Sequence, residues 1–228
     1  MTESISRRPI ASRDRSWAKR SACWLKDIGI RPNMISVAST LFAGIAAVFL
    51  FKSASSDAVA EPFFRGLLLS GVVLGILGRL ICNLLDGMVA LEGGLKTPSG
   101  EVFNDLPDRL SDFLIFVAMG FAATTRQGFY STLWIQAGWA AGTLAVLTAY
   151  IRYLGAACGA GHFFIGPMAK QHRMAVSIVA SVSSILFEPL VFSVGTSFEI
   201  ALGIVVIGSA MTCFRRTLFI VRYLESSK

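Results

Sequence analysis

Polar side chains recur at helical spacing on one face of the apolar segment RLICNLLDGMVAL, which covers residues 79–91. A helix turns by roughly 100° per residue, so four of these residues fall within an arc of about 60°. They are Arg79, Asn83, Asp86 and Ala90. One helix face is therefore expected to carry a cation, an amide, a carboxylate and a small residue.

A second group of polar side chains follows across a glycine-rich connection that contains Gly93, Gly94 and Gly100. Four residues of the next apolar segment fall within an arc of about 100° on a helix. They are Asn104, Asp105, Asp108 and Asp112. Either Asp105 or Asp112 alone is readily explained as a solvated group at a helix end.

The side-chain types of the two groups indicate a hard divalent ion. If the two faces meet, carboxylate and amide oxygens converge, and these are ligands typical of Mg²⁺ or Mn²⁺. Zinc and disulfides are not expected, because the four cysteines are scattered, without a CxxC pair or nearby histidines.

The composition places these groups in a membrane protein. The chain has 228 residues, of which 54% are hydrophobic and 15% are charged, whereas a soluble domain has about 25% charged residues. Several apolar runs reach the roughly 20 residues that span a bilayer as a helix, and they are continuous rather than alternating. The predicted fold class is all-α and polytopic, with about six transmembrane helices. Placing polar groups at the ends of such helices costs free energy, and polar residues retained at this cost usually have a catalytic or binding role.

The net charge of +7 does not indicate nucleic-acid binding, because basic residues gather before the first apolar run. That placement is typical of a cytoplasmic flank attracted to anionic lipid. Residues 1–16 are expected to be a disordered basic leader. Residues 17–31 are expected to form an amphipathic interfacial helix, with Trp17, Trp24 and Ile28 on its apolar side. Asn33 is a candidate cap for the helix that follows.

The main domain is expected to cover residues 32–222, followed by a tail over 223–228. Its six predicted spans are 34–51, 66–91, 104–125, 131–154, 174–194 and 198–220. Gly71, Gly75 and Gly78 favour close packing of the second span against another helix. Lys and Arg counts in the loops predict that both termini, and the polar groups described above, lie on the cytoplasmic side, in the inner membrane if the source is bacterial.

The spacing of the polar groups resembles the CDP-alcohol phosphotransferases, whose signature is D-x-x-D-G-x-x-A-R, about eight residues, then G-x-x-x-D-x-x-x-D. In this chain 83–91 reads NLLDGMVAL, and 100–108 reads GEVFNDLPD after eight residues, so every spacing matches. Residues 32–36 also resemble the Pro-Asn-x-x-Ser/Thr start of the family's first span. Six spans with a cytosolic site and a homodimer are what this resemblance implies.

The chain departs from the signature at three positions. Asn83 and Asn104 replace the first and third aspartates, and Leu91 replaces the arginine. An asparagine keeps one carbonyl oxygen as a ligand but removes a negative charge. The family's pair of divalent ions is therefore expected to be weakened here, to one ion or a different one. Arg79 or Arg109 is a candidate replacement for the missing arginine.

The resemblance implies a phosphatidyl transfer from a CDP-linked lipid, such as CDP-diacylglycerol, to an alcohol, with release of CMP. The implied metal ligands are Asn83, Asp86, Asn104 and Asp108, and Asp108 is also the implied general base. The implied nucleotide-binding residues are Gly87, Ala90, Gly100 and Asn33. The candidate substrate-binding residues are Arg79, Asp105, Arg109, Lys170 and Arg173.

Two other functions stay open at this point. A non-catalytic relative that binds a CDP-lipid or a partner protein would explain Asn83, Asn104 and Leu91. A transporter would also explain charged residues in membrane segments, but it predicts charges deep within several spans. The motif does not specify the acceptor alcohol.

Overall fold

The computed structural model describes residues 16–92, 94–95, 97–123 and 129–226, and all regular structure in these ranges is helical. The helices are α1 (Ser16–Asp27), α2 (Pro32–Ser53), α3 (Ser56–Ala60), α4 (Pro62–Glu92), α5 (Gly100–Ala122), α6 (Phe129–Ala157), α7 (Lys170–Phe187) and α8 (Thr196–Ser226). The all-α prediction is confirmed. The predictions for the leader and for Gly93 lie outside the described residues.

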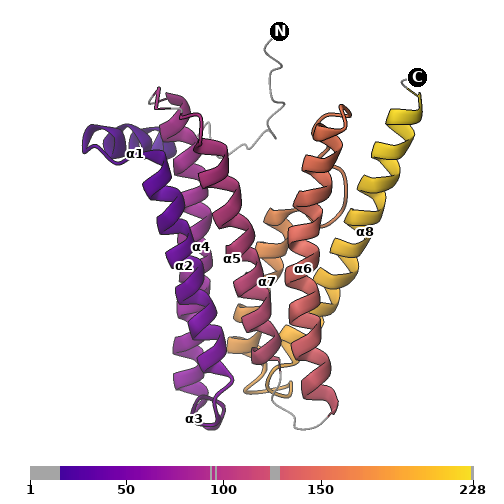
Figure 1. The fold of residues 1–228 in the computed structure, drawn as a ribbon. Helices are drawn as coiled ribbons and strands as arrows, with labels where there is room; N and C mark the ends of the chain where they lie inside the picture. Colours follow the sequence, from indigo (N-terminus) through magenta and orange to yellow (C-terminus); the bar gives the residue numbers. More distant parts are fainter. Residues whose placement is uncertain (1–15, 93, 96, 124–128, 227–228) are drawn as a thin grey trace.

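The six long helices form a closed ring in which each helix packs against two others. The order around the ring is α2, α4, α7, α8, α6, α5 and back to α2. Figure 1 shows α1 and the last turns of α8 at one end of this bundle, and α3 at the opposite end. We call these the α1 end and the α3 end.

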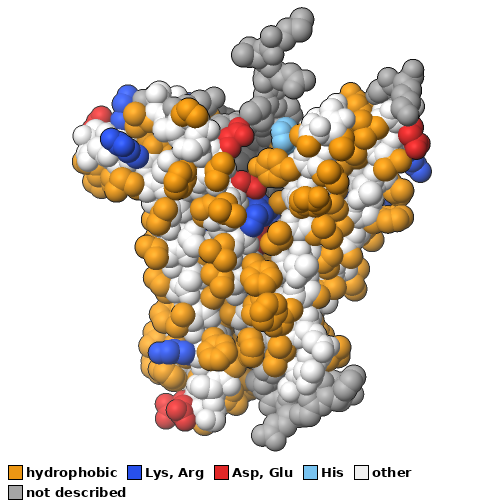
Figure 2. All heavy atoms as spheres, in the orientation of Figure 1, with side chains coloured by type: hydrophobic (Ala, Val, Ile, Leu, Met, Phe, Trp, Pro, Cys, Tyr) orange, Lys and Arg blue, Asp and Glu red, His pale blue; other side chains and the backbone are white. Residues whose placement is uncertain are grey.

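Four ring helices, α2, α4, α6 and α8, are long and apolar enough to cross a membrane. Hydrophobic side chains cover the visible flank of the bundle, and charged side chains gather near its ends and in a hollow at the α1 end (Figure 2). These features support the predicted polytopic membrane class. Helix α5 has several acidic residues in its first half and α7 has only 18 residues, so the count of six spans stays a prediction.

Prolines set two of the helix starts. Helices α2 and α4 begin with Pro32 and Pro62, because proline has a fixed φ and needs no hydrogen bond for an N–H group in the first turn. Helix α4 therefore starts four residues earlier than predicted. The predicted cap at Asn33 is wrong, since Arg31 is the N-cap residue and Asn33 lies within the first turn of α2.

Other helix boundaries also differ from the sequence prediction. Helix α7 ends at Phe187 rather than at residue 194, because the chain turns at Glu188 and Pro189. Helix α8 continues through most of the predicted tail, to Ser226, and α3 forms inside the predicted loop between the first two spans.

Helix α1 lies where the interfacial helix was predicted, but its packing face is different. Ala18 and Ala22 are buried against α4, in a cluster with Met88 and Val89. Trp24 is 62% exposed, and Trp17 and Ile28 are also exposed. The small side chains let α1 approach the bundle closely, and the large apolar ones face outward, as expected for a helix at a lipid interface.

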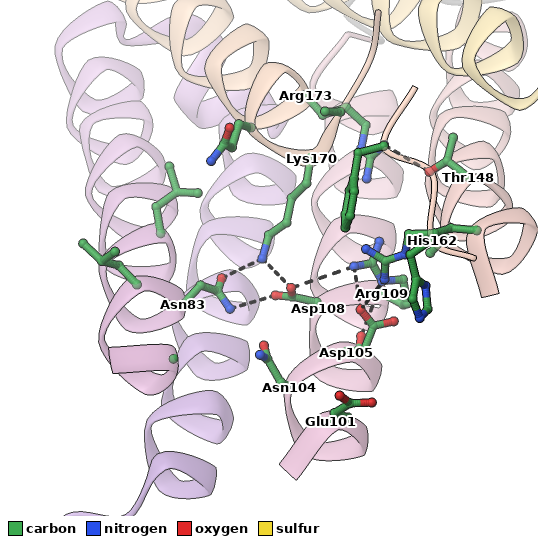
Figure 3. Close-up of a pocket in the computed structure, with 18 of the residues that line it drawn as sticks. Asn83, Glu101, Asn104, Asp105, Asp108, Arg109, Thr148, His162, Lys170 and Arg173 are labelled. Carbon is green, nitrogen blue, oxygen red and sulfur yellow. Dashed lines mark hydrogen bonds and ion pairs between the residues drawn. The ribbon is translucent and has the colours of Figure 1, made fainter. Parts of the chain in front are cut away.

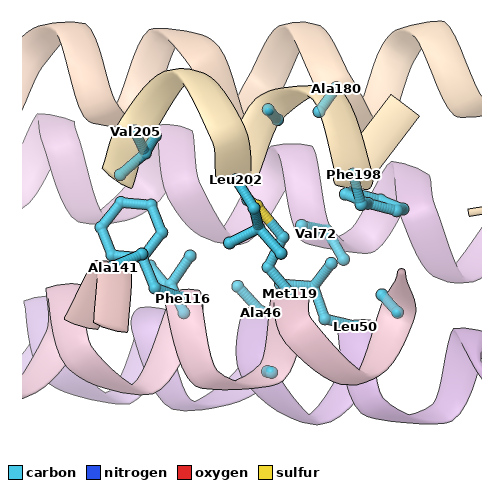
Figure 4. Packing of buried hydrophobic residues seen from close by; sticks show 14 of the residues in the cluster. Ala46, Leu50, Val72, Phe116, Met119, Ala141, Ala180, Phe198, Leu202 and Val205 are labelled. Atoms are coloured by element: carbon cyan, nitrogen blue, oxygen red, sulfur yellow. The ribbon is translucent and has the colours of Figure 1, made fainter. Parts of the chain in front are cut away.

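The core lies between the ring helices (Figure 4). Phe116 and Met119 of α5 are fully buried there, together with Leu202 of α8 and Leu50 of α2. This packing holds α5 in the ring between α2 and α6, and α5 carries five of the predicted site residues in its first half.

Glycines permit the closest helix contacts. A Cβ atom at Gly75 of α4 would lie 3.0 Å from the Phe42 carbonyl oxygen of α2, which confirms the predicted close packing of the second span. A Cβ atom at Gly138 of α6 would lie 2.7 Å from the Phe116 carbonyl oxygen and 2.8 Å from Gly120 Cα. Helices α5 and α6 therefore meet backbone to backbone near the α3 end, and Figure 1 shows them diverging towards the α1 end.

Candidate active site

A cavity of about 570 Å³ lies at the α1 end and is lined by residues of α4, α5, α6 and α7 and of the segment between α6 and α7, together with Trp17 of α1 and Arg216 of α8. Charged and polar side chains from these elements point into it (Figure 3). Among its lining residues are most of the predicted site residues on α5 and α7, namely Asn104, Asp105, Asp108, Arg109, Lys170 and Arg173. The fold thus brings together residues that are up to 69 positions apart in the chain, from Asn104 to Arg173.

At the floor of the cavity, Asn83, Asp108 and Lys170 form a closed hydrogen-bonded triangle (Figure 3). Lys170 Nζ donates to Asp108 Oδ2 at 2.5 Å and to Asn83 Oδ1 at 2.9 Å. Asn83 Nδ2 donates to Asp108 Oδ1 at 2.8 Å. Burial lowers the pKa of Lys170, and the neighbouring Asp108 carboxylate opposes this shift. The triangle joins α4, α5 and α7 and holds Asp108 in a fixed orientation.

Asp86 lies one turn beyond Asn83 on α4 and faces α2. Ser36 Oγ donates to Asp86 Oδ2 at 2.8 Å, and Ser39 Oγ donates to Asn83 Oδ1 at 3.3 Å. Asp86 is 2% exposed, and its Oδ1 atom has no hydrogen-bond partner in the described residues. Its carboxylate interacts electrostatically with both Asp108 and Lys170. Asp86 is therefore a buried carboxylate with spare ligand capacity beside the triangle.

Beneath the triangle, Asp112 is fully buried between two arginines. Arg79 Nη2 donates to Asp112 Oδ1 at 2.5 Å, and Arg173 Nη2 donates to Asp112 Oδ2 at 2.7 Å. Arg79 Nη2 also donates to the Asp108 carbonyl oxygen at 3.1 Å. Asp112 is therefore not the solvated helix-end group that it resembles in isolation. Arg79 is fully buried and does not line the cavity, so its geometry favours support of α5 over the predicted substrate contact.

The rim of the cavity carries a more exposed ion cluster. Asp105 Oδ1 accepts from Arg109 Nη2 at 3.2 Å and from Arg152 Nη2 at 3.1 Å. The Arg152 guanidinium also lies over the rings of Tyr153 and Phe164. Arg152 and His162 line the same cavity and were missed by the sequence prediction, because no local motif marks them.

One of the four predicted nucleotide-binding residues lines the cavity, and the other three do not. Gly87 lines the cavity and is buried on α4. Ala90, Gly100 and Asn33 do not line it. For these three residues the cavity gives no support to the predicted contact with a nucleotide. The exposed Asn104 lies at the cavity mouth, where its amide is accessible.

The donor set fits one divalent ion better than two. Asp86 offers a buried carboxylate oxygen without a partner but does not line the cavity, whereas Asn83, Asn104 and Asp108 do. No group of three or more acidic, histidine or cysteine side chains with metal-binding geometry occurs within the described parts of the chain. Asn83 Oδ1 and Asp108 Oδ2 already bind the Lys170 ammonium.

Ser36 and Ser39 were also missed as site residues, although Ser36 belongs to the Pro-Asn-x-x-Ser segment noted in the sequence. They lie three residues apart on the face of α2 that meets α4. Serines repeated at helical spacing opposite a carboxylate segment are the signal that would have indicated them.

No protein-family model and no curated protein matches the sequence. Solved structures do match: the phosphatidylinositol phosphate synthase of Mycobacterium tuberculosis aligns over 89% of this chain and 92% of its own, with a TM-score of 0.70. The chain has the fold of this synthase. The sequence identity is 18% to that structure, which has CDP-DAG bound, and also 18% to the synthase in complex with manganese and citrate, where the TM-score is 0.71. The apo form of the synthase aligns with 20% identity and a TM-score of 0.67.

Proposed function

We propose that the chain is a CDP-alcohol phosphatidyltransferase of phospholipid biosynthesis. It would move a phosphatidyl group from a CDP-linked lipid, such as CDP-diacylglycerol, to an alcohol acceptor and release CMP. The observation that carries this proposal is the placement of Asp108: a buried carboxylate, oriented by two partners, at the floor of a cavity in a fold shared with a synthase solved with CDP-DAG.

The charges that line the cavity suit an anionic ligand. Five of the charged lining residues are basic and three are acidic. The basic ones are Arg109, Arg152, Lys170, Arg173 and Arg216. A CDP-lipid presents a pyrophosphate, and guanidinium groups bind phosphate oxygens with good geometry. We assign the pyrophosphate to the Lys170 side of the cavity and the cytidine to the surface beside Gly87.

Asp108 is assigned the role of general base. Its carboxylate takes the proton of the acceptor hydroxyl while the alcohol oxygen attacks the phosphorus that bears the lipid. The bond between that phosphorus and the oxygen of CMP breaks, and CMP leaves with the bond electrons. Asn83 and Lys170 orient the Asp108 carboxylate for this step.

The acceptor alcohol is assigned to the rim cluster around Asp105, next to Arg109 and Arg152. A basic rim favours an acceptor that carries a negative charge in addition to its hydroxyl group. A divalent ion, Mg²⁺ or Mn²⁺, held on the Asp86 side of the triangle would neutralise charge on the pyrophosphate.

The arrangement in the membrane completes the proposal. Helix α1 and the last turns of α8 lie at the same end of the bundle as the cavity (Figure 1). With the basic leader on the cytoplasmic side, both termini and the cavity face the cytoplasm. The chain is expected to act as a homodimer.

The test is the release of CMP from CDP-diacylglycerol by the purified chain with Mn²⁺ or Mg²⁺, over a panel of neutral and anionic alcohols. Asp108→Asn should reduce release by about 100-fold or more, the size typical of a lost general base. Glu101→Gln changes an exposed carboxylate of the same cavity and is the matched control.

A non-catalytic lipid-binding protein is the second candidate, because Lys170 and two asparagines occupy the positions around Asp108. That function predicts retention of CDP-diacylglycerol without CMP release for every acceptor in the panel. CMP release that Asp108→Asn does not change would contradict the catalytic proposal.

A further inference from the structure

Lys170 bridges two side-chain oxygens that belong to two different helices. Its ammonium lies 2.9 Å from Asn83 Oδ1 on α4 and 2.5 Å from Asp108 Oδ2 on α5. A simple ion pair would need only the carboxylate. Here the cation also binds a neutral amide oxygen, so it gathers oxygen ligands from neighbouring helices in the way that a metal ion does.

The buried charges of this region are balanced by protein groups alone. Asp86, Asp108 and Asp112 carry negative charge, and Arg79, Lys170 and Arg173 carry positive charge. Asp112 is paired with both arginines. The Asp108 carboxylate lies 2.5 Å from Lys170 Nζ, 3.5 Å from Arg79 Nη2 and 3.9 Å from Arg109 Nη2, so Lys170 is its nearest cation. A divalent ion placed between Asn83 and Asp108 would meet the Lys170 ammonium at contact distance and be repelled by it.

Asp86 is the carboxylate in this region without a direct cation partner. Its Oδ2 atom accepts from the neutral Ser36 hydroxyl, and its Oδ1 atom is buried without a partner. A buried, unpaired carboxylate oxygen is costly, and a cation that coordinates it removes the cost. One position for a divalent ion therefore remains, on the Asp86 side of the triangle.

We infer that the Lys170 ammonium is a built-in cation that takes the place of a second divalent ion between Asn83 and Asp108, so the site takes a single divalent ion at Asp86. This inference rests on the proposed function only for the use of a divalent ion. The two asparagines and the lysine then form one unit: each Asn removes the charge that a second ion would need, and Lys170 supplies the cation that Asp108 needs.

The experiment is a Mn²⁺ titration of the full chain in detergent, with free Mn²⁺ measured by electron paramagnetic resonance. The wild-type chain is expected to bind one Mn²⁺. Lys170→Met should bind a second Mn²⁺, and Mn²⁺ should raise its melting temperature more than that of the wild type, because the ion replaces the lost partner of Asp108. Lys170→Arg keeps the charge and should bind one ion.

Lys52→Met changes an exposed lysine at the far end of α2 and is the matched control. Two Mn²⁺ ions on the wild-type chain would overturn the inference, and so would a single ion on a folded Lys170→Met variant. If Lys170→Met does not fold, two Mn²⁺ ions on the wild-type chain or on Lys170→Arg would still overturn the inference.

The failure of this inference is distinguishable from the failure of the proposed function. CMP release by a chain that binds two ions leaves the function and removes the role of Lys170. A chain that binds one Mn²⁺ ion, gains a second in Lys170→Met and releases no CMP keeps the role of Lys170 and removes the proposed function.

Discussion

Ion pairs lie at both ends of α7: Glu188, just past its last residue, pairs with Arg65 of α4, and Lys170, its first residue, pairs with Asp108 of α5. The two junctions differ in what they leave free. At the α3 end, Glu188 accepts from Arg65 and Ser184 at 2.7 Å each, and from the backbone N–H groups of Gly195 and Ser197 at 3.0 and 2.9 Å. At the α1 end, Lys170 joins Asn83 and Asp108 beside Asp86, which has a free oxygen.

The space around the two junctions differs as well. The cavity beside Glu188 is about 30 Å³, and the cavity above Lys170 is about 570 Å³. Both carboxylate oxygens of Glu188 have protein donors, although Arg65 Nη2 is buried without a partner among the described residues. Asn83, Asp108 and Lys170 line the large cavity at one end, whereas Glu188 lies beside the small cavity at the other. We interpret the first as a candidate ligand site and the second as a structural junction.

The largest effect on stability is expected from breaking the junction between Arg65 and Glu188. Glu188→Ala leaves Arg65 buried without its carboxylate, and the loss of one partner of a buried ion pair costs about 3–5 kcal/mol. We expect a large drop in the melting temperature in detergent and little change in CMP release per folded molecule. The control is Glu61→Ala, an exposed glutamate near the same end. An unchanged melting temperature would contradict the structural role of Glu188.

An intermediate effect, on Mn²⁺ affinity, is expected at the junction around Lys170 and Asp86. Ser36→Ala removes the donor to Asp86 Oδ2, and the loss of a hydrogen bond to a metal-binding side chain typically weakens metal affinity by about 10-fold to 100-fold. Mn²⁺ titration measures it, with Ser70→Ala, an exposed serine bonded to its own helix, as the control. Equal Mn²⁺ affinities of the two variants would remove Asp86 from the ion site.

The smallest effect on stability is expected at the rim. Asp105 and its arginine partners are 16–25% exposed, so this cluster is screened by water. Asp105→Asn should change the free energy of unfolding by less than about 1 kcal/mol, yet it should change the KM for the acceptor alcohol, because Asp105 lies at the assigned acceptor position. A large loss of stability with an unchanged KM would show that the rim is a structural junction like that of Glu188.

Much of the fold could be predicted because it depends on local sequence. The apolar runs gave the long helices. Of the four spaced residues, Asn83 of α4 and Asp108 of α5 are hydrogen-bonded to each other, whereas Asp86 faces α2. The face of α1 was predicted less well, because an amphipathic pattern does not say whether its large apolar side chains or its alanines pack on the protein.

The rest of the site depends on long-range packing that no local pattern contains. Lys170 is 87 residues from Asn83, and the pair forms only because α7 packs against α4 at this depth. Asp112 becomes a buried centre only when Arg79 and Arg173 reach it from two other helices. These long-range contacts supply the positive charges that balance the aspartates of the motif segment.

The backbone contact between Gly120 and Gly138 bears on the shape of the cavity. Because α5 and α6 meet there without side chains between them and diverge towards the α1 end, a methyl group at Gly138 would push the two helices apart beneath the cavity. Under the proposed function, we expect this change to alter which acceptor sizes the cavity admits, even though position 138 does not line it.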